Sequence, residues 1–257
     1  MSLLLLKLVL TPALIGAASL AGRKWGHAIS GWLVALPLTT GPIVFLLALT
    51  HGSTFAAHTA AGILAGGFSL AAFVLVYGRA APRLTWLPTL TLATLAFGLM
   101  TLILENITLP VLPLWAGVVA GFLLVMQLLP RGLNAHEPVA ALPGRWDIPL
   151  RMILATTFVL LITGLAPALG PHLAGLLSPF PLFTATLAAF GQHLYGAAAA
   201  IKVLHGLLMG LFSYATFMLT LILLLQPAGI ALAFAAAIAV TAAIQAGTLW
   251  LLRRGTD

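Results

Sequence analysis

The chain has 257 residues, of which 62% are apolar and only 6% are charged. A soluble domain carries about a quarter charged residues, so this composition cannot cover a water-exposed surface and predicts an all-α polytopic membrane protein. The net charge of +7 does not indicate a nucleic-acid partner, because the few basic residues lie between apolar segments. The chain has no cysteine, which excludes disulfides, thiolate metal sites and a cysteine nucleophile.

Apolar stretches long enough to cross a bilayer, which takes about 20 residues per helix, recur along the whole chain. The nine stretches span residues 2–21, 30–50, 56–78, 84–104, 108–129, 148–167, 173–193, 199–225 and 228–252. The first is interpreted as a retained helix rather than a signal peptide, because it lacks a basic start and Lys7 interrupts it. The proline-rich segment 130–147 predicts a solvated loop.

Basic residues gather at one set of helix ends. These residues are Arg23, Lys24, Arg79, Arg83, Arg131, Arg145, Arg151, Arg253 and Arg254. The connections at the opposite ends carry none of the Lys or Arg residues. Because cytoplasmic loops are enriched in Lys and Arg, this asymmetry predicts an external N-terminus and a cytoplasmic C-terminus.

An internal repeat relates the two halves of the chain at an offset of 144 residues. Residues 26–75 match residues 170–219 without a gap, with 16 identities in 50 positions. A shared bias towards leucine and alanine does not explain the glycines that stand in register, such as Gly52 with Gly196, or the proline pair Pro37 and Pro181.

The stretch 108–129 has no counterpart in the repeat and reverses the direction of the second half. The sequence therefore predicts about nine transmembrane helices in a 4+1+4 inverted-repeat arrangement. Repeat 1 covers 1–104, the linking helix and a cytoplasmic loop cover 105–147, and repeat 2 covers 148–257. Inverted repeats of this kind are typical of secondary transporters, whose sites lie near the bilayer midplane at the repeat interface.

The second helix of each predicted repeat is interrupted by prolines, which remove a backbone donor and clash with the preceding turn. The interruptions lie at Pro37-Leu-Thr-Thr-Gly-Pro42 and at Ser178-Pro-Phe-Pro-Leu-Phe-Thr184. Backbone groups freed in lipid must be satisfied by protein, water or ligand. One interpretation is a pair of broken helices that frame a substrate site; the other is an ordinary kink healed by threonine hydroxyls. The candidate binding residues at this level are Pro37, Thr39, Thr40, Pro42, Pro181, Thr184 and Thr186.

Basic side chains inside predicted spans are costly and suggest function. His58 and Lys202 are repeat partners, and His205 follows Lys202 by three residues, on the same helix face. If Lys202 and His205 face the interior, they favour an anionic group of the solute. The alternative is that they snorkel to the headgroups, as Lys7 and Arg151 are also placed to do.

Sites for catalysis, metals or cofactors are not indicated. Glu105 is the only carboxylate outside the long loop, its flank and the tail, and it lies at the end of a predicted span. Without a buried carboxylate, a proton-driven cation exporter is hard to build, although histidines could carry protons. No His, Asp or Glu cluster has metal-ligand spacing, so no metal, no cofactor and no enzymatic activity are expected.

Residues 3–52 combine a leucine-rich start with Lys7, the basic turn Arg23-Lys-Trp-Gly26 and the segment 31–40, above all Leu36-Pro-Leu-Thr39. In these features they resemble the GlpM-like family of small four-helix bacterial membrane proteins. It implies a bacterial inner-membrane location, and the whole chain then looks like two such units fused in opposite orientations. The family has no established mechanism to carry over.

The leading interpretation is a multi-pass secondary transporter that moves a small polar or anionic solute by alternating access. Its partners are the lipid bilayer, the solute and protons or another coupling ion. The alternative is a membrane-embedded lipid-handling or envelope-assembly accessory protein without transport activity. The identity of the solute, the direction of transport and the oligomeric state stay open.

Overall fold

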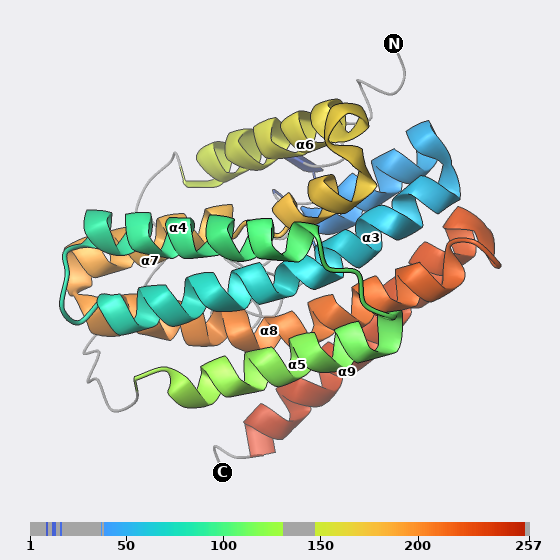
Figure 1. The fold of residues 1–257 in the computed structure, drawn as a ribbon. Helices are drawn as coiled ribbons and strands as arrows, with labels where there is room; N and C mark the ends of the chain where they lie inside the picture. The colour runs from blue at the N-terminus through green and yellow to red at the C-terminus, as the bar shows by residue number, and fades with distance from the viewer. Residues whose placement is uncertain are drawn as a thin grey trace.

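A computed structural model describes residues 9, 12, 13, 16, 37, 39–130 and 147–254, and all regular elements in this part are α-helices. Figure 1 shows their arrangement. The helices are α3 Thr40–Ala80, α4 Trp86–Glu105, α5 Val111–Leu128, α6 Asp147–Leu177, α7 Leu182–Tyr195, α8 Ala197–Leu224 and α9 Gly229–Arg254. All except α7 contain a stretch long and apolar enough to cross a bilayer. The helices therefore have the length and composition of a multi-pass membrane protein.

The prediction of about nine transmembrane helices is wrong for the described residues, which form seven helices with six candidate spans. The predicted helices 30–50 and 56–78 share one element, α3, because Gly52 turns the chain at φ 87° without a linker. Helix α6 likewise continues through Gly170, at φ 76°. Helix α7 has 14 residues, too few to span a bilayer alone. The predicted helix 2–21 lies outside the described residues, apart from isolated positions.

The offset of 144 residues also relates helix boundaries. Helix α8 begins one residue after Gly196, as the longer arm of α3 begins one residue after Gly52. Gly196 has φ 84° and ψ −179°, close to the φ 87° and ψ 167° of Gly52. Only glycine adopts this backbone region readily, which explains why both positions hold glycine. The two arms of α3 meet at the right-hand end of Figure 1, whereas α7 and α8 meet at the left-hand end.

A side-chain hydrogen bond between equivalent positions joins two helices in each half. Thr101 of α4 donates to Ser69 of α3 at 2.9 Å, and Gln245 of α9 donates to Ser213 of α8 at 3.0 Å. Both pairs are buried, and their members stand 144 residues apart. Helix pairs α3–α4 and α8–α9 are thus held by equivalent polar contacts inside an apolar bundle.

Helix α3 lies at the centre of the fold and contacts α4, α5, α6, α8 and α9. Its glycines allow close packing: a β-carbon at Gly62 would collide with the carbonyl oxygen of His172 and lie 3.1 Å from Cα of Gly175. The small-residue pair Gly62 and Gly66 therefore lets α6 and its following turn approach α3 closely. The outer helices α4, α5 and α9 instead expose large apolar side chains such as Leu95, Leu112 and Leu232, as lipid contact requires.

Candidate functional site

A short non-helical segment, 178–181, separates α6 from α7 near the middle of the bundle. Pro179 and Pro181 have no N–H to continue a helix. Ser178 ends α6 by donating its hydroxyl to the carbonyl of Ala174 at 2.6 Å. The amide of Phe180 bonds back to Leu177 at 3.2 Å, and α7 starts after Pro181, its N-cap residue. The predicted proline interruption of the second half is therefore a complete break in the helix.

Helix α3 begins at a comparable place in the first half. Thr39 is its N-cap residue and makes no side-chain capping hydrogen bond, and its first turn contains no acidic residue. The amide of Gly41 bonds to the carbonyl of Pro37 at 2.8 Å. Pro37 thus stands just before the first helical turn, as Pro181 does before α7.

The starts of α3 and α7 meet around one cavity of about 110 Å³. Its lining residues are Pro37, Thr39, Thr40, Leu70, Ala155, Phe158, Pro179, Phe180, Pro181, Leu182, Phe183, Thr184, Leu207, Gly210, Leu211 and Tyr214. Several of them are partners at the 144-residue offset, including Thr40 with Thr184 and Leu70 with Tyr214. The cavity therefore lies where equivalent positions of the two halves converge.

Two buried threonines at the cavity make no side-chain hydrogen bond within the described residues, and the hydroxyl of Thr40 is itself buried. Thr40 is 4% exposed and its Oγ1 is unpaired. Thr184, 6% exposed, also makes no side-chain hydrogen bond within the described part. An unpaired buried hydroxyl costs about 1–3 kcal/mol, so the Thr40 hydroxyl is poised for a partner in the cavity, and the Thr184 hydroxyl lies beside the same cavity.

Backbone donors are free at the same place. In the first turn of α7, Leu182 donates to Phe180 at 2.8 Å and Ala185 to Pro181 at 2.7 Å. For the amides of Phe183 and Thr184, the described residues provide no acceptor. Orphan donors are expected at a helix start without a cap. Here they belong to residues that line the cavity.

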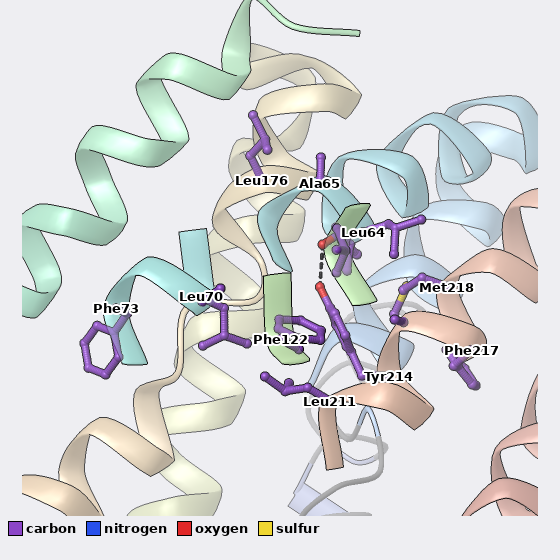
Figure 2. Packing of buried hydrophobic residues seen from close by; sticks show 14 of the residues in the cluster. Leu64, Ala65, Leu70, Phe73, Phe122, Leu176, Leu211, Tyr214, Phe217 and Met218 are labelled. Atoms are coloured by element: carbon purple, nitrogen blue, oxygen red, sulfur yellow. Dashed lines mark hydrogen bonds between the residues drawn. The ribbon is translucent and has the colours of Figure 1, made fainter. Parts of the chain in front are cut away.

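The break between α6 and α7 packs closely against neighbouring helices. Phe180 meets Phe97 and Phe73 edge-on, with ring centroids 5.2 and 6.2 Å apart. Gly66 brings α3 against the break, since a β-carbon there would lie 2.6 Å from Cγ of Pro179. Tyr214 donates its hydroxyl to the carbonyl of Ile63, the contact drawn as a dashed line in Figure 2. The break thus packs against α3 and α4, and the hydrogen bond of Tyr214 joins α8 to α3.

Half of the residues predicted for the site line this cavity. They are Pro37, Thr39, Thr40, Pro181 and Thr184. Pro42 is buried one helical turn beyond Pro37 but is not a lining residue. Thr186 donates to the carbonyl of Leu182 at 2.8 Å, so its hydroxyl is used within α7.

The structure does not bring the predicted basic residues to the cavity. His58 and Lys202 are exposed, and each lies six residues beyond a corner glycine, Gly52 or Gly196. His205 is partly buried and its Nδ1 lies 3.0 Å from the carbonyl of Ile201 in its own helix. These placements favour snorkelling over solute binding for His58 and Lys202.

Sequence reasoning missed the aromatic walls of the cavity. Phe180 and Phe183 stand inside the predicted proline interruption, so their positions carried a usable signal. The sequence carried no such signal for Tyr214, because its repeat partner is Leu70 and the helix around it is uniformly apolar. Within the described residues, no three His, Asp or Glu side chains lie close enough together to hold a metal ion.

No family model, curated protein or solved structure matches the chain. The resemblance of residues 3–52 to the GlpM-like family stays a prediction. What can be argued about function therefore rests on the cavity and on the helices that frame it.

Proposed function

We propose that the chain is a secondary transporter that moves a small polar or anionic solute by alternating access through the cavity between α3 and α7. One observation carries this proposal: two helix starts at equivalent positions of the repeat face one cavity and leave buried donors free. Broken helices that present their ends to a central site at a repeat interface are a recurring design of secondary transporters.

The proposal includes an inverted relation between the halves. The helix corners at Gly52 and Gly196 lie at opposite ends of the bundle (Figure 1), as inversion requires. Arg79 donates through Nε to the carbonyl of Leu128 at 2.8 Å, which joins the ends of α3 and α5 on one side. We assign that basic side to the cytoplasm of a bacterial inner membrane, with the N-terminus outside and the C-terminus inside.

Alternating access requires each end of the bundle to open in turn, and polar contacts lie near both ends of α4. Near its start, Gln192 of α7 donates to the carbonyls of Ala81 and Leu84 at 3.1 and 2.8 Å. Near its end, the His172 Nε2 lies 3.2 Å from the carbonyl of Leu104. A 20-residue helix is about 30 Å long, so these contacts are a membrane thickness apart. In the proposed cycle they break in alternation.

The test is solute uptake by the purified protein in proteoliposomes, measured with a panel of small labelled polar solutes and anions. Thr40→Val and Thr184→Val each remove one free hydroxyl at the cavity and are expected to weaken transport at least tenfold, the usual effect of losing a hydrogen bond to a charged group. Thr163→Val is the matched control, because Thr163 is equally buried but bonds to the carbonyl of Val159 in its own helix at 2.7 Å.

Lys202→Ala is expected to transport normally, because Lys202 is exposed. Normal uptake by both cavity variants would refute the site. Absence of any uptake by a folded wild-type protein would refute transport and favour the accessory role in lipid handling or envelope assembly.

A further inference from the structure

The cavity has a marked electrostatic character although no charged side chain lines it. Among its described lining residues there is no Asp, Glu, His, Lys or Arg. Two helix N-termini contribute instead, and each carries roughly half a positive elementary charge from the aligned peptide dipoles. Their sum is about one positive charge, and it acts on a cavity whose lining is mainly apolar.

The two first turns offer different donors: in α3 the amides of Gly41 and Ile43 bond to Pro37 and Thr39, so its contribution is the Thr40 hydroxyl, whereas α7 leaves backbone amides free. Neither N-cap residue, Thr39 or Pro181, makes a side-chain cap, and neither first turn contains an acidic residue. In α7 the amides of Phe183 and Thr184 have no acceptor within the described residues. The buried and unpaired Oγ1 of Thr40 points to a ligand independently of the helix ends.

We propose, building on the transport function above, that the solute is a small monovalent anion, held by the N-terminal turns of α3 and α7 without a cationic side chain. One negative charge balances the two half-charges. A dianion would keep a second charge uncompensated in an apolar interior, which is strongly unfavourable.

Cations fit the cavity poorly. A cation would face the positive helix ends, and the chain holds only four Asp and Glu residues. Glu105 is exposed at the end of α4 and does not line the cavity. The positive helix ends therefore disfavour cation binding in the cavity.

Size narrows the solute further. The volume of about 110 Å³ is well below the roughly 300 Å³ at the lower end of pockets for drug-sized ligands. An anion of a few heavy atoms, such as a halide, nitrate or formate, fits this volume.

The experiment measures thermal unfolding of the detergent-purified full chain by tryptophan fluorescence, since the chain has six tryptophans. Sodium chloride, nitrate and formate are titrated against sodium gluconate at constant ionic strength, and sodium sulfate is the divalent comparison. A ligand that binds only the folded state raises the midpoint in a concentration-dependent manner. We expect a saturable rise with at least one of the small monovalent anions, and none with gluconate.

Variants separate a bound anion from a general salt effect. Thr184→Val is expected to need about tenfold more anion for the same rise, the usual effect of losing a hydrogen bond to a charged group, whereas Thr163→Val titrates like the wild type. The proposal is overturned if no anion gives a saturable rise, if sulfate acts as strongly as the monovalent anions, or if Thr184→Val titrates normally. Because Thr184 makes no bond that its replacement would break, the variant should fold.

Uptake measurements distinguish this inference from the proposed function. Saturable anion binding without uptake would retain the anion site and refute transport. Uptake of a neutral polar solute without anion binding would support transport and refute the assignment of the solute as an anion. Uptake of nitrate that follows an imposed membrane potential would support both.

Discussion

The longer arm of α3 and helix α8 hold equivalent positions in the two halves, but their surroundings differ. Both follow a corner glycine with nearly the same backbone angles, and both present a side chain to the cavity, Leu70 and Tyr214. Yet Gly62 of α3 is pressed against α6, whereas no described atom lies within 4 Å of a β-carbon at its partner, Gly206. The corners and the cavity are thus shared by both halves, whereas the packing around them differs.

The fifth helix explains part of this difference. Helix α5 has no counterpart in the repeat, and it packs against both α3 and α8. On α3 it comes so close that a β-carbon at Gly67 would lie 2.7 Å from Cγ1 of Val118. A helix without a partner in the other half gives α3 and α8 different surroundings, and α3 is the one that lies at the centre of the fold.

The largest expected effect on stability comes from alanine substitutions at Gly62 and Gly206, which are partners at the 144-residue offset. Gly62→Ala places a methyl group against the carbonyl oxygen of His172, and overpacking of this kind costs about 1–3 kcal/mol or more. Gly206→Ala has open space and gains up to about 1 kcal/mol of helix propensity. Thermal unfolding in detergent measures both. Equal destabilisation by the two variants would contradict the asymmetry between α3 and α8.

Alanine substitutions at the two corner glycines test whether the corners of the two halves are equivalent. Gly52→Ala and Gly196→Ala meet no neighbouring atom within 4 Å in the described structure, so their cost comes from the backbone alone. A non-glycine residue at these angles costs about 1–3 kcal/mol. We expect the two unfolding midpoints to fall by similar amounts. A large drop for only one variant would show that the corners are not equivalent.

Removing either of the two equivalent interhelical hydrogen bonds is expected to have the smallest effect on stability. Ser69→Ala removes the acceptor of Thr101, and Ser213→Ala removes the acceptor of Gln245. Hydrogen bonds between membrane helices average about 0.6 kcal/mol, so each variant should unfold slightly earlier than the wild type. If either substitution cost several kcal/mol, that contact would have a role that its partner in the other half lacks.

The sequence was most informative where backbone chemistry is restrictive. Two prolines within three residues predicted the break before α7, since neither can donate to a helix. Glycine pairs in register predicted matching features, and the corners at Gly52 and Gly196 are among them. The number of helices was mispredicted because a glycine at positive φ turns the chain without a coil segment, so that length and hydropathy cannot show whether one element or two will form.

Side-chain direction could not be obtained from composition. Whether Lys202 faces the interior depends on which side of α8 packs against α3, and a uniformly apolar helix gives no amphipathic signal. The structure places Lys202 at the surface and Tyr214, from the same helix, at the cavity. The positive character of the site then comes from helix ends rather than from the basic side chains that the sequence offered.

The most direct test of the central claim, that both helix starts bind one solute, is a double-mutant cycle on uptake by proteoliposomes. It compares the wild type, Thr40→Val, Thr184→Val and the double variant. If both hydroxyls contact the same solute, each single change weakens apparent affinity about tenfold and the two effects are not additive, with a coupling of at least 0.5 kcal/mol in magnitude. Normal affinity in both single variants, or strictly additive losses, would contradict a single site shared by the two halves.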